Sequence, residues 1–532
     1  MDTPEQRDLI TTVPDGLVII ELDGDLSEAL RNPIFLHALS TDVIPEYLQK
    51  RRWFASKGER MKCVSIASAT PMKYPADVIL CELDVELDGH TETYLLPLTI
   101  VWDDAPPSAL VLQLALSRVR QGLRMGVLTD GFATEAMAKG LVAGLSDSLA
   151  DHTTLESLGT QQLQALELGD ATAVHWLSAE QSNSSLILGG VAIIKLIRHI
   201  FPGVHPEVEM TRFLTSRGYR NTAPFFGEVA LTTPDGDRHT LIIAQGAINN
   251  QGDGWGWMLT HLRTALDRNV TEDEAQRFKP LLDFLSNVGT RLGELHVTLA
   301  QPTDEDDFCP LLAGPSEVEH WRSGVIDQLN GALYTLSGSI NQLEAALATR
   351  IRNIFDRKDR LLATITDLSG KLLGAKMIRN HGDFHLGQIL VADGDAYIID
   401  FEGEPSRSIA ERRAKTSPLR DVAGLVRSLD YLAATALLDH GTVEADHETR
   451  SALISSFAAE AEKRFLASYL AKVETSTALH MTAQDFTRLL DLFLLQKAAY
   501  EIDYEAGNRP DWLAIPSRGF ADVAERLLEI AQ

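Results

Sequence analysis

The segment HGDFHLGQ (residues 381–388) places Asp383 five residues before Gln388, and Asp400 and Glu402 follow in IIDFEGEP. Transfer of a phosphoryl group to a hydroxyl needs a carboxylate that orients and deprotonates the hydroxyl, and oxygen ligands that hold Mg²⁺ on the nucleotide phosphates. We therefore assign Asp383 as the candidate base. Gln388 and Asp400 are the candidate ligands of Mg²⁺, because this hard cation prefers oxygen. Glu402, on the same strand face as Asp400, is a candidate for a second metal or a water-mediated contact.

A hairpin must bring the amide and the second carboxylate together, and the sequence after residue 388 predicts one. Two apolar runs, ILVA and AYIID, flank DGD (residues 393–395), a turn signal typical of tight hairpins. A three-residue loop places Gln388 opposite Asp400, whereas a two-residue loop places Gln388 opposite Ile399, so the register stays open. Both registers bring the two oxygen ligands close together. The two histidines of HGDFHLGQ are expected to brace the loop through hydrogen bonds.

A strand upstream supplies a candidate phosphate-binding lysine. In VAIIKLI (residues 191–197) alternate residues share a face, so Lys195 projects among apolar side chains and needs a charged partner. The next segment, HPEVEMTRFL, predicts a helix that begins near Pro206, and Glu207 or Glu209 on this helix can reach back to the lysine. We favour Glu209, although an acidic residue in a first helical turn also complements the helix N-terminus.

The loop before that strand, EQSNSS (residues 180–185), is rich in Ser and Asn. Ser182, Asn183 and Ser184 can offer hydroxyl, amide and backbone N–H donors to phosphates, although such clusters are usually turns. The loop is not a Gly-rich GxGxxG loop, and no GxxxxGK[ST] occurs in the chain, which excludes a Walker-type phosphate site.

Charge and composition limit the partners. The 532-residue chain carries 75 acidic and 48 basic side chains, a formal net charge of −27. Such a surface repels phosphate backbones and anionic membranes, so neither nucleic acid nor a membrane is an expected partner, and a nucleotide needs a local pocket of Lys, amides and metal. The three cysteines are too few for a disulfide framework or an ordinary zinc site. With neither a signal-peptide pattern nor an apolar run of about 18 residues, we expect a cytoplasmic protein.

The local patterns also predict the domains. Short β-rich runs separated by turns occupy residues 17–101 and return at 172–248, and patterns of helical period dominate from about residue 257 onward. We predict an α+β protein with a bilobal, kinase-like outline. A mostly β N-terminal domain (1–150) precedes a small β-rich lobe with Lys195 (151–250) and a large helical lobe with the catalytic loop (251–532).

The motifs resemble those of the maltokinase family, relatives of the aminoglycoside phosphotransferases within the protein-kinase-like fold. The resemblance rests on EQSNSSLILGGVAIIKLIR, HGDFHLGQIL, IIDFEGEPSRSIAERRAKTSPLRDVAGLVRSLDY and YEAGNRPDWLAIPSRG, and RRWFASKGERM near residue 51 resembles the opening of that family's N-terminal cap domain. It implies that residues 1–150 are such a cap domain. It also implies phosphorylation of maltose at its anomeric hydroxyl with ATP and Mg²⁺, giving maltose 1-phosphate for α-glucan, glycogen and trehalose metabolism.

The resemblance implies the roles named above for the motif residues and adds two regions. In IIAQGAIN (residues 242–249) it implies a hinge, with Gln245 and Ala247 among the residues whose backbone reads adenine. The segment YEAGNRPDW (residues 504–512) resembles the acceptor-sugar side, where aromatic rings can stack on a sugar and polar groups can bond its hydroxyls, unless it only packs against the helical core. The candidate acceptor residues are Tyr504, Glu505, Asn508, Arg509, Asp511 and Trp512.

Two departures from the family pattern leave alternatives open. The chain is longer than typical maltokinases, with extra sequence in the first 45 residues and around DEDD (residues 304–307). Some relatives are fused to a trehalose synthase domain, which nothing in this chain resembles, so a separate trehalose synthase is a candidate partner. The alternatives are a kinase for another small sugar such as glucosamine or glucose, and a nucleotide-binding pseudokinase that regulates a glucan enzyme.

Overall fold

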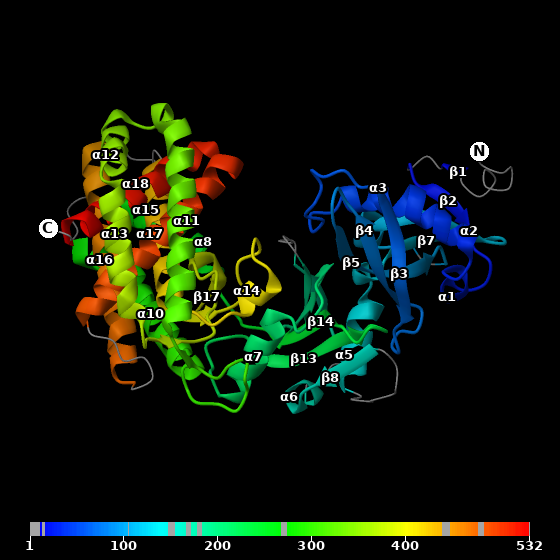
Figure 1. Ribbon diagram of the computed structural model, residues 1–532. Coiled ribbons are helices and arrows are strands. Elements are labelled where there is room, and N and C mark those ends of the chain that lie inside the picture. Colours follow the sequence, from blue (N-terminus) through cyan, green and yellow to red (C-terminus); the bar gives the residue numbers. More distant parts are fainter. Residues whose placement is uncertain are drawn as a thin grey trace. The chain divides into compact units, whose positions relative to one another are not determined.

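The computed structural model describes residues 11–12, 16–104, 106–146, 155–165, 172–177, 183–267, 274–438, 447–476 and 483–530. The chain forms two compact units, whose elements are labelled in Figure 1. Unit 1 comprises Met1–Arg212 and Pro224–Ala247, and unit 2 comprises Phe213–Ala223 and Ile248–Gln532. Unit 1 holds both large sheets, and unit 2 holds the long helices.

The first sheet of unit 1 has the strand order β1-β2-β6-β7-β5-β4-β3, and β12 pairs with β5. The pairing of β2 with β6 is parallel, whereas the other pairings along this order are antiparallel. The elements of this region are β1 (Thr11–Thr12), β2 (Val18–Glu21), α1 (Leu26–Ala29), α2 (Pro33–Ala38), the π-helical turn η2 (Leu39–Val43), α3 (Ile44–Gln49), β3 (Cys63–Pro71), β4 (Ile79–Glu86), β5 (Thr91–Trp102), α4 (Ala109–Gln113), β6 (Ala115–Gln121), β7 (Arg124–Asp130), η3 (Gly131–Ala133) and β12 (His199–Ile200).

Alternation of apolar residues along β4 and β5 explains why this sheet has a hydrophobic core on each face. Tyr94, Leu96 and Leu98 of β5 pack with α1–α3 and η2 in one buried cluster. Leu80 of β4 and Leu95 of β5 belong to a second cluster, together with residues of α5 and of the second sheet. The two sheets of unit 1 therefore share one core.

The second sheet of unit 1 is six-stranded, in the order β8-β13-β14-β11-β10-β9, and all of its pairings are antiparallel. The helix α7 follows this sheet's Lys195 strand, β11, and continues into unit 2. The elements are α5 (Glu135–Ser146), β8 (Leu155–Gly159), α6 (Gln161–Gln164), β9 (Val174–Trp176), β10 (Ser184–Leu188), β11 (Ala192–Leu196), α7 (Pro206–Ser216), β13 (Phe225–Thr232) and β14 (Arg238–Gly246).

Unit 2 is dominated by long helices and carries two short two-stranded sheets, the pair β15–β16 and the hairpin β17–β18. Its described elements are α8 (Gly254–Leu266), α9 (Glu274–Arg277), α10 (Lys279–Leu299), β15 (Leu311–Leu312), α11 (Pro315–Ser339), η4 (Ile340–Gln342), α12 (Ala345–Asp356), α13 (Lys358–Ser369), η5 (Gly370–Leu372), β16 (Lys376–Met377), η6 (Leu386–Gln388), β17 (Ile389–Ala392), β18 (Asp395–Ile398), α14 (Ile409–Arg413), α15 (Leu419–Leu438), α16 (His447–Glu474), α17 (Ala483–Asn508), η8 (Pro510–Trp512) and α18 (Ala514–Ile530).

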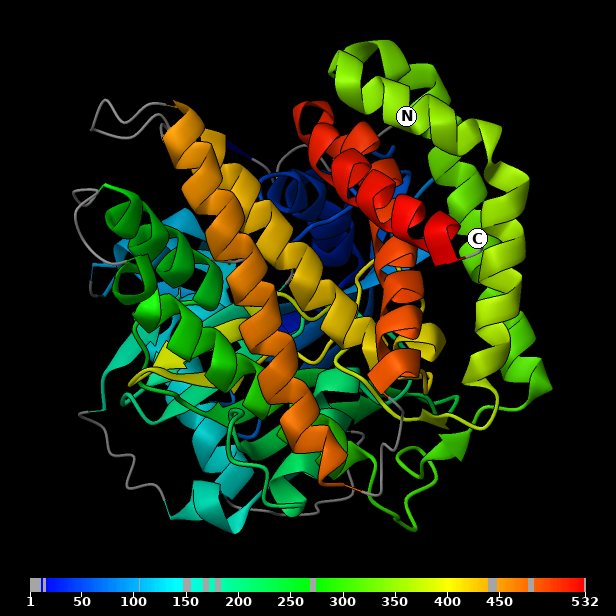
Figure 2. The ribbon, with the colours of Figure 1, turned by 90° about the vertical axis from the view of Figure 1, so that its left-hand side faces the viewer.

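Two glycines allow α10 and α16 to pack closely. A Cβ on Gly289 would lie 2.3 Å from the carbonyl oxygen of Phe465, and one on Gly293 would lie 2.8 Å from Cβ of Lys472. Figure 2 shows α16, in orange, running along α15 and beside the green α10. These helices support the segment that holds the candidate catalytic residues.

The β-rich beginning and the helical remainder agree with the patterns in the sequence. The division into residues 1–150, 151–250 and 251–532 stays a prediction, and the two sheets that it separates lie in one unit with a shared core. The change of unit between Ala247 and Ile248 falls inside the predicted hinge. None of the helices that the structure describes is long and apolar enough to cross a membrane.

Candidate active site

The hairpin after Gln388 has the two-residue loop. Ala392 pairs with Asp395, which leaves Asp393 and Gly394 as the loop. Both loop residues have positive φ, +51° and +77°, as the tight turn between twisted strands requires. The backbone N–H of Ile399 donates to the carbonyl oxygen of Gln388 at 3.0 Å. The three-residue alternative, with Gln388 opposite Asp400, is therefore wrong.

A buried carboxylate from α15 holds the backbone of the catalytic loop. Asp421 accepts hydrogen bonds from the N–H groups of His381, at 2.8 Å, and Gly382, at 2.9 Å, and its carboxylate lies 3.2 Å from Nε2 of His296. Burial alone would raise the pKa of Asp421, but His296 and these N–H groups hold the pKa below its usual value. Sequence reasoning missed Asp421, although the residue lies in the quoted motif SPLRDVAG.

The two histidines brace the loop, as predicted. Nε2 of His381 donates to the carbonyl oxygen of Ile399 at 2.8 Å, which ties the loop to the strand extension that leads to Asp400. Nδ1 of His385 accepts from the N–H of Gly387 at 3.0 Å. Burial lowers the pKa of His385, so this imidazole is neutral at pH 7.

Asp383, the candidate base, is half-buried and lies beside a lysine that the sequence did not single out. Nζ of Lys497 on α17 is 3.7 Å from Asp383 and 3.4 Å from Glu404. Burial alone would lower the pKa of Lys497, but the carboxylates of Glu404 and Asp383 outweigh burial and raise it. The ammonium group therefore stays charged at neutral pH between two carboxylates.

Glu404 is the centre of a cationic cluster in this acidic protein. Its carboxylate accepts from Nε of Arg407 at 2.6 Å and from Nη2 of Arg420 at 3.1 Å, in addition to Lys497. Only 5% of the Glu404 side chain is exposed. Burial alone would raise its pKa, but Lys497 and the two arginines hold the pKa below its usual value.

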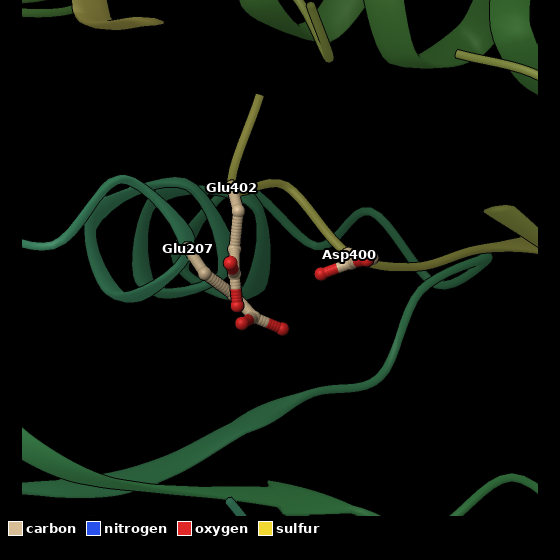
Figure 3. A group of neighbouring side chains, drawn as sticks. All are labelled: Glu207, Asp400 and Glu402. Atoms are coloured by element: carbon tan, nitrogen blue, oxygen red, sulfur yellow. The ribbon is translucent and has the colours of Figure 1, made fainter. Parts of the chain in front are cut away.

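The predicted metal ligands lie on one short stretch of unit 2. Gln388 ends the turn η6, and Asp400 and Glu402 follow β18. Figure 3 shows the side chains of Asp400 and Glu402. Asp400 has φ +67°, a left-handed conformation that is uncommon outside glycine and is often found at functional sites. One amide and two carboxylates offer the oxygen donors that Mg²⁺ prefers, so the residues fit this ion. Their role as metal ligands stays a prediction.

Lys195 on β11 forms its ion pair with Glu207. The distance from Nζ of Lys195 to the Glu207 carboxylate is 2.6 Å, and both side chains are largely buried. Nε2 of Gln245 donates to the same carboxylate at 3.3 Å. Our choice of Glu209 as the partner is wrong, because the first turn of α7 presents Glu207 to the lysine. Glu207, also drawn in Figure 3, belongs to unit 1 with Lys195.

The predicted phosphate loop is only partly described. Ser182 lies outside the described residues, whereas Asn183 and Ser184 are buried. Oδ1 of Asn183 accepts from the N–H of Arg198, and Oγ of Ser184 accepts from Nε of Arg198. Ser185 pairs directly with Lys195 across the β10–β11 ladder, so its side chain shares the face of Lys195. Contact of this loop with phosphate stays a prediction.

The predicted hinge follows the end of β14. Gln245 is buried in that strand, and its side chain bonds Glu207. The N–H of Ala247 already donates to the carbonyl oxygen of Val191 at 2.9 Å, so this N–H is not available to an adenine ring. Adenine recognition by the remaining backbone groups of residues 242–249 stays a prediction.

The six predicted acceptor residues cluster at the end of α17 and in η8. Glu505 is buried, and its carboxylate accepts from the hydroxyl of Tyr431 and from Nη2 of Arg509. The Arg509 guanidinium also lies over the rings of Tyr504 and Trp512, at 5.6 and 5.2 Å from their centroids. These contacts are mutual, and sugar binding by this group stays a prediction.

A cavity of about 300 Å³ lies within unit 2 next to the catalytic loop. It shares Lys497 with the surroundings of Asp383, and none of the six predicted acceptor residues lines it. Tyr500 of its wall stacks on Tyr504, with ring centroids 6.2 Å apart, which connects the cavity to the predicted acceptor segment. The side chains that give it its chemical character are Trp321, Glu404, Arg407, Arg420, Lys497 and Tyr500.

Comparisons with known proteins relate this chain to kinases with an N-terminal cap domain. The family model of the maltokinase N-terminal cap domain matches residues 47–133. The resemblance to the maltokinase family is confirmed. The chain is 28% identical over 386 residues to a glucosamine kinase of Mycolicibacterium smegmatis, covering 70% of this chain and 87% of that protein. It is 26% identical over 364 residues to a glucosamine kinase of Streptacidiphilus jiangxiensis, covering 67% and 75%.

The solved structures establish the fold. A structure of glucosamine kinase in complex with glucosamine, ADP and inorganic phosphate matches with a TM-score of 0.62 and 20% identity, over 90% of this chain and 98% of that chain. A second crystal form of glucosamine kinase matches with a TM-score of 0.61. The predicted α+β, bilobal kinase-like fold with an N-terminal cap domain is confirmed. These relatives are kinases, which supports a phosphotransferase.

Proposed function

We propose that this protein is an ATP-dependent sugar kinase that phosphorylates maltose at its anomeric hydroxyl, giving maltose 1-phosphate. The observation that carries the proposal is the position of Asp383. Asp421 holds its loop by two backbone hydrogen bonds, and Lys497 connects Asp383 with a cavity of about 300 Å³. That volume is at the lower end of the range for small-molecule sites. The glucosamine kinases among the relatives support sugar as the acceptor class.

In the proposed reaction, a carboxylate oxygen of Asp383 accepts the proton of the sugar hydroxyl while the hydroxyl oxygen forms its bond to the γ-phosphorus of ATP. The bond between the γ-phosphorus and the bridging oxygen breaks, and ADP leaves with the electron pair. Nζ of Lys497 lies 3.7 Å from Asp383 and places a positive charge beside the carboxylate that accepts the proton. Gln388, Asp400 and Glu402 would hold Mg²⁺, which would neutralise charge on the phosphates.

The charges of the cavity favour a neutral sugar over an amino sugar. An ammonium group on the acceptor would need a carboxylate as its partner. Glu404 is already paired with Arg407, Arg420 and Lys497. Glu411 and Glu317 are exposed carboxylates, and each uses one oxygen at the start of a helix, so Glu404 is the buried carboxylate of the cavity lining. Glucosamine remains the second candidate, because the two curated relatives are glucosamine kinases.

A panel of maltose, glucosamine and glucose in an ADP-release assay tests the acceptor. We expect maltose to give the highest kcat/KM. A higher value for glucosamine would replace maltose by the second candidate, and ADP binding without release of ADP on any sugar would favour the pseudokinase.

The variant Asp383→Asn tests the role of the base. We expect it to bind ATP as the wild type does and to lose roughly 10³-fold or more in kcat, because a positioned base and its charge are both lost. The exposed loop residue Asp393 provides the control, and Asp393→Asn should leave kcat unchanged. Normal turnover of Asp383→Asn would refute the assignment.

A further inference from the structure

The strand that carries Lys195 passes from one sheet of unit 1 into the other within four residues. Lys195 pairs with Ser185 and Ile243 in the six-stranded sheet. His199 and Ile200 then pair with Tyr94 and Thr93 of β5, in the eight-stranded cap sheet. Ile197 and Arg198 lie between these two ladders with buried side chains, and the charged one, Arg198, is only 1% exposed.

The Arg198 side chain connects both sheets by hydrogen bonds. Its Nε donates to Oγ of Ser184, the first residue of β10, at 2.8 Å. Its Nη1 donates to the carbonyl oxygen of Leu95 in β5 at 3.3 Å, and its Nη2 donates to the Asp130 carboxylate at the end of β7 at 2.6 Å. One guanidinium group therefore joins the strand after the Ser/Asn loop to two strands of the cap domain.

The partner carboxylate is held equally firmly. Asp130 is completely buried, and it also accepts from the hydroxyl of Tyr47, at 3.1 Å, and from the N–H of Phe132, at 3.0 Å. The Arg198 guanidinium lies over the rings of Trp53 and Phe132, at 4.8 and 5.6 Å from their centroids. The planar guanidinium group can satisfy all of these directional contacts in only one orientation. It therefore fixes the relative positions of the strands to which it is bonded.

The main chain of Arg198 contributes to the same connection. Its N–H donates to the side chain of Asn183, and its carbonyl oxygen accepts from the N–H of Leu95 at 2.8 Å. Arg198 is thus bonded to Asn183 and Ser184 at the end of the Ser/Asn loop, and it follows Lys195 by three residues. Arg198 therefore contacts one predicted phosphate-binding element directly and lies on the strand that carries the other.

We propose that Arg198 is a positioning residue through which the cap domain sets the place of Lys195, Asn183 and Ser184 for nucleotide binding. The proposal rests on the proposed function in one respect, that Lys195 binds nucleotide phosphate. According to this proposal, the cap domain raises the affinity for nucleotide without itself binding a ligand.

The test measures ADP affinity by isothermal titration calorimetry in the full-length protein, and KM for ATP and for the acceptor separately. We expect Arg198→Met to weaken ADP binding and raise KM for ATP by about tenfold or more, since a misplacement of about 1 Å can cost that much. KM for the acceptor should stay within about twofold. Arg198→Lys, which keeps the charge but not the fork, should give an intermediate loss, and it carries the test if Arg198→Met does not fold.

Two matched variants separate positioning from general stability. Arg118→Met removes a half-exposed cation that pairs with Asp103 on the same cap sheet, and it should leave ADP affinity unchanged. Leu83→Ala creates a cavity in the cap core without removing any of the Arg198 contacts named above, and it should lower Tm without lowering ADP affinity at temperatures where the protein is folded.

Folded Arg198 variants with wild-type ADP affinity would overturn the proposal, as would an equal loss of affinity in Leu83→Ala. ADP binding needs no acceptor, so the two proposals can fail separately. If the protein phosphorylates no sugar but its ADP affinity still depends on Arg198, the proposed function is refuted and this inference stands.

Discussion

At Asp383 the neighbour of greatest consequence is Lys497, whose ammonium group separates the candidate base from Glu404. Without this cation the negative charges of Asp383 and Glu404 would repel each other, and the Asp383 carboxylate would lose an ion-pair contact that holds it in place. The lysine therefore supports the base electrostatically, although it lies on a helix more than 100 residues further along the chain.

The variant Lys497→Met tests this support. We expect kcat to fall by about 10²-fold or more and the free energy of unfolding to fall by roughly 2–4 kcal/mol, because two partly buried carboxylates lose their shared cation. Steady-state kinetics and urea unfolding measure the two effects. Lys463→Met on α16 removes a lysine that is 76% exposed and should change neither quantity measurably. Unchanged kcat in Lys497→Met would contradict the role given to the lysine.

The hairpin of β17 and β18 is the element that places the metal-ligand candidates, and Asp395 anchors it. The Asp395 carboxylate accepts from Nε and Nη2 of Arg291 on α10, at 3.0 and 2.7 Å, and from Nδ2 of Asn221. Burial alone would raise the pKa of Asp395, but the guanidinium outweighs burial and lowers it. The folded protein therefore binds a proton at this group less readily than the unfolded chain does.

The sign of the pH dependence follows from that lowered pKa. The ionised Asp395 stabilises the fold fully above its unfolded pKa of about 3.9, and this stabilisation is lost as the pH falls through the lower folded pKa. Between pH 7 and pH 5, we expect the free energy of unfolding of Asp395→Asn to be about 1–2 kcal/mol lower than that of the wild type. We expect this gap between variant and wild type to close below about pH 4. Urea unfolding between pH 3 and pH 7 measures the gap. A gap of the same size at pH 3 would contradict the argument, and Asp393→Asn in the same hairpin is the control.

The same hairpin shows how far the sequence alone could predict the site. The pair Asp393-Gly394 between apolar runs is sufficient to predict a tight turn. The register was open because it depends on whether Asp393 adopts a positive φ. An Asp residue tolerates this conformation, but no local sequence pattern shows whether it adopts it. The choice between Glu207 and Glu209 failed for a similar reason. The two side chains point about 200° apart on a helix, and the phase depends on where α7 begins.

The cavity could not be predicted, because tertiary packing alone builds it. Trp321 on α11 and Gln496 on α17 are 175 residues apart, and Nε1 of the tryptophan donates to the amide oxygen at 3.1 Å. Asp421 could have been suspected from the motif that contains it, but its target, the backbone of residues 381 and 382, leaves no trace in side-chain types. A side chain whose hydrogen-bond partners are backbone groups cannot be recognised from the types of the partner residues.

At the scale of the whole chain, the shared core makes the cap domain and the smaller lobe one physical unit. Leu95 of the cap sheet and Ile242 of the six-stranded sheet are both completely buried in the same hydrophobic cluster. Separating the two sheets would expose this cluster and would also break the buried pair of Arg198 and Asp130. Exposing the cluster and breaking the ion pair both cost free energy, so we expect the two sheets to unfold together.

We therefore expect calorimetry to show unit 1 unfolding in a single transition. Leu95→Ala and Ile242→Ala, one in each sheet, should both lower the Tm of that transition, each by the equivalent of roughly 2–5 kcal/mol, since each leaves a cavity in the common core. Ile502→Ala supplies the comparison, because Ile502 is buried in α17 of unit 2 and should shift the unfolding of the helical unit instead. If Leu95→Ala and Ile242→Ala shift two different transitions, the cap domain is an independent domain, and its contribution to nucleotide binding through Arg198 would have to be weaker than the buried contacts imply.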